Sequence, residues 1–449
     1  MNPKVSLLLL LLTGSIVNRS TDASTLVVRG ANLFDSETKA MRPDQTIVVL
    51  GERIATVGET RQVKIPKGST ILDGRGKYII PGLIDAHAHV MTVLYWAQMT
   101  GDETLPYYLA NGVTAIRNTG DGIAVQKLIR QYALEHPQVS PRLFMCSPLI
   151  DRDPPIHRDI GWPVTRPDQV PAFVADMAMW GVTTLKLYAG CSPDVARKVI
   201  EEGHRHGLVV TGHLSSYRVE DALADGIDCI EHIESISGFL LTDPHDRHSL
   251  DISGDTARRL IQRIVERKVF IDPTLSVFWG TLFFVDVPEV VQHPDNARMP
   301  KRLLEFWAKD RETRVNNYSS GPLSVRKATF QKYKDLVGML HRAGVRLLVG
   351  TDAPEPQVPP GYSLHHEMQL LVESGVPPAD VLAAATLNNA RVLKQEANLG
   401  SIQVGKLADM VILDANPVAD IQNSRRIHKV IKGGVPLEPV SILRAAPSN

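Results

Sequence analysis

The sequence predicts an α/β fold: a TIM barrel of eight parallel strands and a small β domain that both chain ends form. Over residues 81–395, short apolar segments alternate with amphipathic helical stretches, a pattern typical of parallel βα units. Residues 24–80 and 396–449 instead carry short alternating strands punctuated by Gly and Pro. Because chain termini often lie close together, we expect these two ends to combine into one domain.

The composition is that of a globular protein. The 449 residues are 43% hydrophobic and 22% charged, and 49 Lys and Arg balance 49 Asp and Glu. These values exclude a disordered chain and a collagen-like fibre, and a neutral chain does not predict nucleic-acid binding. The three cysteines are an odd number at wide spacing, which does not predict a disulfide framework.

The first 23 residues have the layout of a secretory signal peptide. Lys4 precedes an apolar run from Val5 to Leu12, and small and polar residues follow. This run is too short to span a bilayer, which requires about 20 apolar residues. We therefore expect a secreted or periplasmic protein whose mature chain is not inserted in a membrane.

The two β-rich ends show period-two alternation. The leading end contains TLVVRGANLF, QTIVVLGERIATVG and STILDGRGKYII, and the closing end contains MVILDANP and RRIHKVIKGGVPLEPV. Gly and Pro between these stretches mark the turns.

Eight apolar segments of the middle region are expected to be the barrel strands. They are Tyr78–Asp85, Thr114–Asn118, Leu143–Ser147, Thr183–Tyr188, Val209–His213, Cys229–His232, Val269–Thr274 and Arg346–Thr351. Amphipathic stretches such as SPDVARKVIEEGHRHG and TARRLIQRIVERK separate them. Most of the strands end on polar residues, at the face where TIM barrels carry their sites.

Two insertions, 148–165 and 275–345, are long for barrel loops. The second contains many aromatic residues, which argue against disorder. It could be a packed subdomain, or its aromatic side chains could contact a substrate.

The ends of five strands carry candidate metal ligands. His87 and His89 are two residues apart, so they point to the same side of a strand and can converge on a divalent ion. His213, His232 and Asp352 stand at the ends of three further strands. Buried polar groups need partners, and divalent metals can supply them.

Lys186 lies between Leu185 and Leu187 in an otherwise apolar strand. An inward amine would be desolvated, and its pKa would fall. A neutral amine can add carbon dioxide and become a carbamate, an anion able to bridge two cations. Alternatively, the side chain extends to the rim and keeps its charge in water.

Taken in order, these residues resemble the site of the amidohydrolase superfamily of metal-dependent hydrolases. The resemblance also includes IIPGLIDAHAH, LLVGTDA, LHHEMQLLVESGVPPADVLAAATLNNARVL and GSIQVGKLADMVILDANP. Within the superfamily, the chain is most similar to the imidazolonepropionase-related and Xaa-Pro-dipeptidase-like group. The resemblance implies a distorted (β/α)8 barrel with a β-sandwich made from both chain ends.

The resemblance also implies two divalent ions, with zinc fitting the ligand set. His87, His89 and Asp352 would hold the buried ion, His213 and His232 the exposed one, and a carbamate on Lys186 would bridge them. A hydroxide bridging the ions would attack the substrate. Asp352 would act as general base and acid, with His232 as the second catalytic residue. Mononuclear relatives exist, but Lys186 favours the binuclear form.

The expected activity is hydrolysis of a carbon–nitrogen bond in a small amide or peptide, either a dipeptide of the Xaa-Pro type or an N-acyl amino acid. Alternatives are a cyclic amide or lactone hydrolase and, less favoured, a non-catalytic barrel. The protein could also form a homo-oligomer. Loops rather than the fold determine the substrate.

Residues near the expected mouth are weaker candidates for substrate binding. Tyr188 is two residues after Lys186 and shares its face of the strand. Arg152, His157 and Arg158 follow the third strand, where an Arg could pair with a substrate carboxylate. Tyr188 could equally be a core aromatic, and the three loop residues are more often solvated charges. For His365, which begins a helix, we expect a supporting role.

Overall fold

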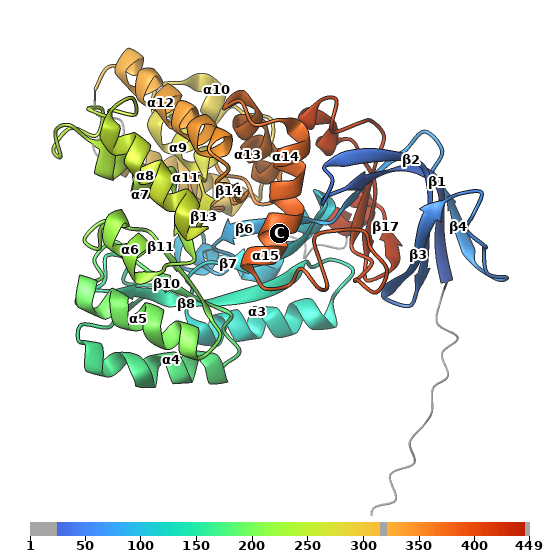
Figure 1. Ribbon diagram of the computed structural model, residues 1–449, viewed down its shortest axis with the longest axis horizontal. Helices are drawn as coiled ribbons and strands as arrows, with labels where there is room; N and C mark the ends of the chain where they lie inside the picture. Colours follow the sequence, from blue (N-terminus) through green and yellow to red (C-terminus); the bar gives the residue numbers. More distant parts are fainter. Residues whose placement is uncertain (1–24, 315–320, 445–449) are drawn as a thin grey trace, which may run out of the picture.

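The computed structural model describes residues 25–314 and 321–444, which form two sheets and the helices around the larger one (Figure 1). The predicted signal peptide lies outside the described residues. No helix within the described ranges has the length and apolar composition needed to cross a membrane. The α/β fold with a barrel and a β domain is confirmed.

The smaller sheet joins both chain ends, as expected. Its strands are β1 (Thr25–Asp35), β2 (Ala40–Leu50), β3 (Arg53–Glu59), β4 (Thr70–Asp73), β5 (Tyr78–Pro81), β15 (Met410–Leu413), β16 (Ile427–Lys432) and β17 (Val435–Leu437). They follow the order β17-β16-β15-β5-β1-β2-β3, with β4 also paired to β1. Alternate apolar residues of both ends, among them Val28, Ile47 and Ile431, form a separate core.

The larger sheet is the barrel. Its strands are β6 (Leu83–Ala88), β7 (Val113–Asn118), β8 (Arg142–Asp151), β10 (Thr184–Leu187), β11 (Val209–Gly212), β12 (Cys229–Glu231), β13 (Phe270–Asp272) and β14 (Arg346–Leu347). Neighbouring strands are parallel throughout. The amide of Ala86 donates to Val349 O at 3.0 Å, which joins β6 to the segment after β14. A short strand, β9 (Gly161–Pro163), lies beside β8.

The first expected strand, Tyr78–Asp85, is wrong as a single barrel strand. Its first half is β5 of the smaller sheet, and the barrel begins only at Leu83. The switch occurs at Gly82, whose amide donates to Asp409 O at 2.8 Å while the amide of Leu83 donates to Gly112 O at 3.0 Å. A Cβ at position 82 would lie 2.1 Å from Thr114 Oγ1, so the crossing requires glycine. The apolar run continues through the switch and therefore does not reveal it.

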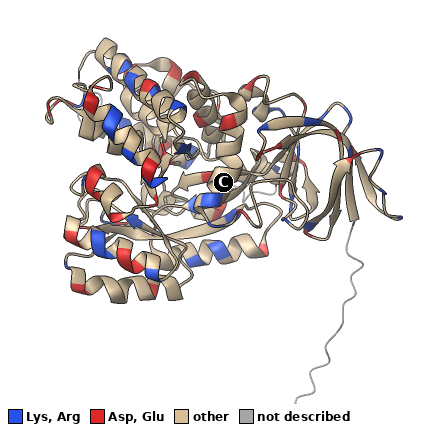
Figure 2. Cartoon of the chain, in the orientation of Figure 1, with Lys and Arg blue, Asp and Glu red and all other residues tan. Residues whose placement is uncertain are grey.

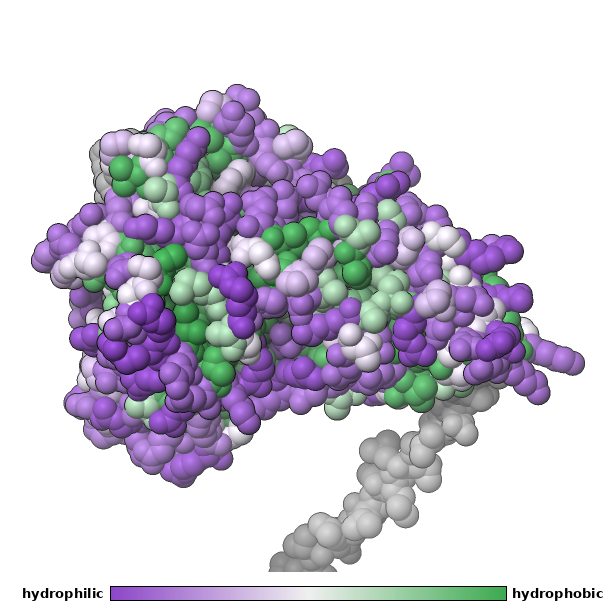
Figure 3. Space-filling model, turned by 45° about the horizontal axis from the view of Figure 1, so that its top comes forward, coloured by the Kyte–Doolittle hydropathy of each residue, from purple (hydrophilic) through white to green (hydrophobic). Residues whose placement is uncertain are grey.

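Helices cover the outside of the barrel. They include α3 (Ile123–Glu135), α4 (Val170–Met179), α5 (Pro193–Arg205), α6 (Val219–Asp225), α8 (Asp255–Arg267), α12 (Leu323–Arg342), α13 (Tyr362–Glu373) and α14 (Pro378–Ala383). In α5, Val195, Val199 and Ile200 face the core, while Lys198 pairs with Glu201 on the outside. Residues of both charges are interspersed along such helices, and hydrophilic side chains cover much of the displayed surface (Figures 2 and 3).

Shorter helical segments complete the chain. They are α1 (Thr92–Trp96), η1 (Gly101–Glu103), α2 (Leu105–Ala110), η2 (Pro167–Gln169), α7 (Ile233–Ser237), η3 (Gly238–Leu240), η4 (Asn296–Arg298), η5 (Ala384–Asn388), α15 (Asn389–Val392), η6 (Ile421–Arg425) and α16 (Pro439–Arg444).

The 275–345 insertion is a packed helical subdomain in its described part. Besides α12, it contains α9 (Leu275–Phe283), α10 (Pro288–Val291) and α11 (Lys301–Arg314). Phe284, Trp307 and Tyr333 are almost fully buried. Trp307 Nε1 donates to Pro354 O at 3.1 Å, which fastens α11 to the loop after Asp352.

Candidate metal centre

The ends of five barrel strands bring six predicted residues to one cavity of about 140 Å³. His87 lies on β6 and His89 directly follows that strand; Lys186 lies on β10. The other three follow their strands: His213 after β11, His232 after β12 and Asp352 after β14. All six line the cavity wall.

His87, His89 and Asp352 form the more compact part of this group. Asp352 Oδ1 lies 3.3 Å from His87 Nε2 and 3.1 Å from His89 Nε2. One ligand atom from each residue lies within 4.8 Å of the others, so the three could hold one metal ion. Nitrogen and carboxylate oxygen ligands suit zinc and several other divalent metals.

Lys186, His213 and His232 form the second part. The rings of His213 and His232 lie 4.5 Å apart, and the His232 ring is 4.7 Å from that of His87, so the two parts adjoin. Lys186 is buried rather than at the rim, with 1% of its surface exposed. Burial lowers the pKa of its amine, which favours the neutral form that carbon dioxide can attack.

Several buried polar atoms of the cavity form no hydrogen bond within the described residues. Within the described residues, His87 Nε2, His89 Nδ1 and Lys186 Nζ are buried and have no hydrogen-bond partner. Leaving such a group unsatisfied costs about 1–3 kcal/mol. Burial, with the nearby Lys186 second, lowers the pKa of His213 to about 3, so its imidazole is neutral and can act as a ligand. The residues therefore fit a metal centre.

Backbone strain directs the strand ends inward. His232, Thr274 and Asp352 have φ angles of 62°, 47° and 65°, in the left-handed region. Such conformations cost of order 1–3 kcal/mol for residues other than glycine and cluster at functional sites. Thr274 Oγ1 lies 2.8 Å from His232 Nδ1, so this strained turn also sets the orientation of the His232 ring.

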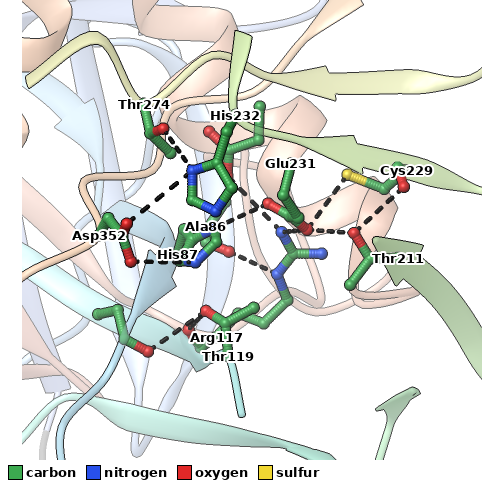
Figure 4. A network of polar contacts seen from close by, with 12 residues as sticks. Ala86, His87, Arg117, Thr119, Thr211, Cys229, Glu231, His232, Thr274 and Asp352 are labelled. Atoms are coloured by element: carbon green, nitrogen blue, oxygen red, sulfur yellow. Dashed lines mark hydrogen bonds and ion pairs between the residues drawn. The ribbon is translucent and has the colours of Figure 1, made fainter. Parts of the chain in front are cut away.

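A buried charge network behind His87 was not predicted from the sequence (Figure 4). His87 Nδ1 lies 2.8 Å from Glu231 Oε2, and Arg117 Nη2 donates to Glu231 Oε1 at 2.6 Å. The hydroxyl of Thr211 also hydrogen-bonds Glu231 Oε1. Although burial opposes it, Arg117 holds the pKa of Glu231 well below its usual range. The sequence feature that could have indicated this network is a charged residue within each of two predicted strands, Arg117 in β7 and Glu231 in β12.

Asp272 completes this network from β13. Its carboxylate lies 3.6 Å from Arg117 Nη2, and burial raises its pKa well above the usual range. His87, Glu231 and Asp272 also have ligand atoms within 4.8 Å of one another. Arg117 already supplies positive charge beside both carboxylates, so this second group is better described as a support for His87 than as a metal site.

The mouth of the cavity includes parts of both insertions. Tyr188 lies on the wall, with its ring 5.2 Å from that of His213 and 5.3 Å from that of His157. Ile160 and Phe278 add apolar wall from the first and second insertions.

The remaining candidates lie elsewhere. Arg152 and Arg158 are exposed in the loop after β8, and neither lines the cavity. His365 is buried in α13 and likewise does not line it.

Known proteins share this fold. Residues 78–437 match the amidohydrolase family. The imidazolonepropionase of Alkaliphilus metalliredigens (strain QYMF) is 21% identical over 457 residues, which cover 87% of this chain and 89% of that protein. The solved structure of a Bifidobacterium longum protein, provisionally named a prolidase, is 26% identical with a TM-score of 0.70, covering 94% of this chain and 99% of its own. The structure of a Xaa-Pro dipeptidase is 21% identical with a TM-score of 0.69, covering 92% and 100%.

Proposed function

The chain belongs to the amidohydrolase family and is a hydrolase of carbon–nitrogen bonds, and we propose that it uses two divalent metal ions to cleave an amide bond in a small substrate. One observation carries this proposal: six polar side chains from five strand ends line a single buried cavity. Burying that many polar groups without a ligand would be strongly unfavourable.

In the proposed centre, His87, His89 and Asp352 hold one ion, and His213 and His232 hold the other. Lys186, once it has lost a proton and added carbon dioxide, would supply a carbamate as a further ligand. The buried, unpartnered Nζ of Lys186 supports this role. Zinc is the proposed metal because imidazole and carboxylate ligands suit it.

Two bound divalent ions would lower the pKa of a water molecule and polarise the amide carbonyl. Asp352 would accept the proton that this water loses, because its carboxylate lines the cavity directly beside His87 and His89. As the water oxygen forms its bond to the carbonyl carbon and the carbon–nitrogen bond breaks, Asp352 would deliver the proton to the leaving nitrogen. His232 is fixed beside it by Thr274 and contributes to the same catalytic wall.

The proposed substrate is a dipeptide of the Xaa-Pro type or an N-acyl amino acid. The similarity to a protein provisionally named a prolidase supports the first. The imidazolonepropionase of Alkaliphilus metalliredigens supports an alternative, hydrolysis of a cyclic amide or lactone. A non-catalytic barrel is disfavoured because all six positions keep residues able to bind metal.

The test removes the metal and then assays two panels, one of Xaa-Pro dipeptides and one of N-acyl amino acids. A chelator should abolish turnover and added zinc should restore it.

Asp352→Asn should lower kcat by about 10²–10⁴-fold, the range for loss of a general acid–base group, with an unchanged circular dichroism spectrum. The exposed Asp176 offers a control, and Asp176→Asn should keep wild-type turnover. If metal-replete protein hydrolyses no compound in either panel, the proposed substrates are wrong.

A further inference from the structure

A second hollow opens next to the metal cavity and shares one wall with it. This outer pocket, of about 440 Å³, lies between α1 and α11 and is lined by Tyr95, Trp96, Arg302 and Phe306, among others. Trp96 also lines the metal cavity. The two hollows therefore adjoin at Trp96.

The metal cavity is small compared with ordinary small-molecule sites. Its volume of about 140 Å³ lies below the roughly 300–1,000 Å³ of ordinary small-molecule sites. It can accommodate the scissile amide and its immediate neighbours. The rest of a larger substrate has to extend beyond the mouth, and the outer pocket provides the additional room.

The outer pocket presents aromatic surface held in a fixed position. Trp96 is partly exposed and stacks on Phe306, with ring centroids 5.4 Å apart and planes inclined by 19°. Arg302 Nη1 donates to Gln98 O at 2.7 Å, and the same guanidinium pairs with Glu103. These contacts fasten α11 to the segment after α1, so the pocket wall is formed before a ligand arrives.

The outer pocket carries charged residues of both signs, so its charge favours neither an anionic nor a cationic ligand. Its lining includes Arg302 and Lys309 but also Glu305 and Asp310. Aromatic contact is therefore the feature that can discriminate between ligands, because planar rings gain from stacking beyond the area that they bury.

We propose that the outer pocket is a substrate subsite that binds an aromatic group attached to the scissile amide, with Trp96 as its principal contact. This proposal rests on the proposed amide hydrolysis, because only then is the bound compound a substrate. Binding in the pocket can nevertheless be measured without turnover. It predicts a preference for amides that carry an aromatic ring over amides that carry a methyl group at the same position.

The test compares two matched pairs of amides with metal-replete protein. N-benzoylglycine and N-acetylglycine differ on the acyl side, while glycine benzylamide and glycine methylamide differ on the amine side. The ratio of kcat/KM, aromatic over methyl, should fall roughly tenfold in Trp96→Ala for one of the pairs. Trp96→Phe should restore most of the ratio. Trp180, which is 42% exposed at the end of α4, provides the control, and Trp180→Ala should keep the wild-type ratio.

Binding of the same four compounds to metal-free protein, measured by calorimetry, separates the two proposals. If none is hydrolysed but an aromatic compound binds about tenfold more tightly to wild-type protein than to Trp96→Ala, the subsite stands and these compounds are not substrates. If Trp96→Ala changes neither the kcat/KM ratios nor the binding ratios by more than twofold, the subsite is wrong. Circular dichroism of each variant checks that it is folded.

Discussion

At the scale of single residues, the orientation of His87 depends on charged side chains that do not line the cavity. Glu231 lies against the Nδ1 side of the ring, and the ring's Nε2 faces Asp352. Arg117 compensates the buried carboxylate of Glu231. A carboxylate on the second nitrogen of an imidazole ligand fixes the ring and its tautomer and raises its basicity. Glu231 is therefore inferred to be a positioning residue for His87.

Replacing Glu231 with Gln should weaken metal binding by about 10–100-fold, the range seen when such supporting partners are removed. The amide keeps the shape but loses the charge that polarises the ring. Competition between the folded protein and a chromogenic chelator measures this affinity directly.

Two further variants make that result interpretable. Thr211→Val removes one hydrogen bond to Glu231 and leaves its charge, so it should have a smaller effect in the same direction. Glu202 is also buried but pairs with Lys198 and Arg205 on α5, so Glu202→Gln should leave metal affinity unchanged. Equal affinities for wild-type protein and Glu231→Gln would show that Glu231 does not support the site.

Five of the six cavity residues could be predicted because they stand at or near the end of an apolar strand; Lys186 lies inside β10, and its burial was predicted only beside the alternative that it extends to the rim. Arg117 and Glu231 could not, because a charged residue within a strand is equally compatible with an exposed face. Their pairing requires β7 and β12 to meet inside the barrel, although three strands separate them in the sheet order. Such contacts depend on closure of the barrel, which no local pattern reports.

At the scale of elements, α13 is held against its neighbours by one buried histidine. His365 Nδ1 lies 2.8 Å from Ser424 Oγ, and its Nε2 lies 3.0 Å from Asn111 O. The ring thus joins α13 to η6 and to the end of α2. Burial, with Arg425 second, lowers the pKa of His365 to about 3, so the folded protein keeps this ring neutral.

This histidine should make stability fall on acidification. In the unfolded chain, His365 titrates near its ordinary pKa of about 6.5 and binds a proton that the folded state cannot bind until about pH 3. The titration of His365 should therefore contribute a decrease of about 1.4 kcal/mol in the free energy of unfolding for each pH unit below about 6.

Urea unfolding at several pH values between 7 and 4.5 measures this dependence. His365→Gln can keep both hydrogen bonds but cannot titrate, so its stability should fall less steeply than that of the wild type. His245 is exposed, and His245→Gln should retain the wild-type slope. Parallel curves for wild-type protein and His365→Gln would contradict the assignment.

The sequence indicated a supporting role for His365, but it did not identify the elements that the residue joins. Asn111 and Ser424 are 254 and 59 residues away along the chain, respectively. The sequence likewise did not reveal the change of sheet at Gly82, because one continuous apolar run crosses there from the smaller sheet into the barrel. Periodicity predicts that a segment is a strand, but not which sheet pairs with it.

At the scale of the whole molecule, one buried carboxylate links the β domain to the barrel. Asp409, just before β15, accepts a hydrogen bond from Arg142 Nε of β8 at 2.7 Å and another from Gly433 N at 2.7 Å. Its carbonyl accepts the amide of Gly82 at 2.8 Å. Lys432 is also buried nearby, where burial lowers the pKa of its amine to about 8. One residue thus links both sheets and the crossing between them.

Replacing Asp409 with Ala should destabilise the protein by about 2–4 kcal/mol. The change leaves Arg142 and Lys432 without their compensating carboxylate, and losing one partner of a buried pair is far more costly than losing a surface pair. Urea unfolding measures the difference. Asp168→Ala, which removes an exposed ion pair with Arg166, should cost less than about 1 kcal/mol. Equal costs for the two substitutions would show that Asp409 does not stabilise the junction.

The same substitution should also weaken metal binding, because β5 passes through Gly82 directly into β6, which carries His87. Without the carboxylate, the segment around Asp409 that fixes Gly82 loses its attachment to Arg142. Metal affinity should therefore fall in Asp409→Ala, measured by the same chelator competition under conditions where the variant is fully folded. If stability falls while metal affinity is unchanged, the barrel holds its ligands independently of the β domain. The junction would then have a purely structural role.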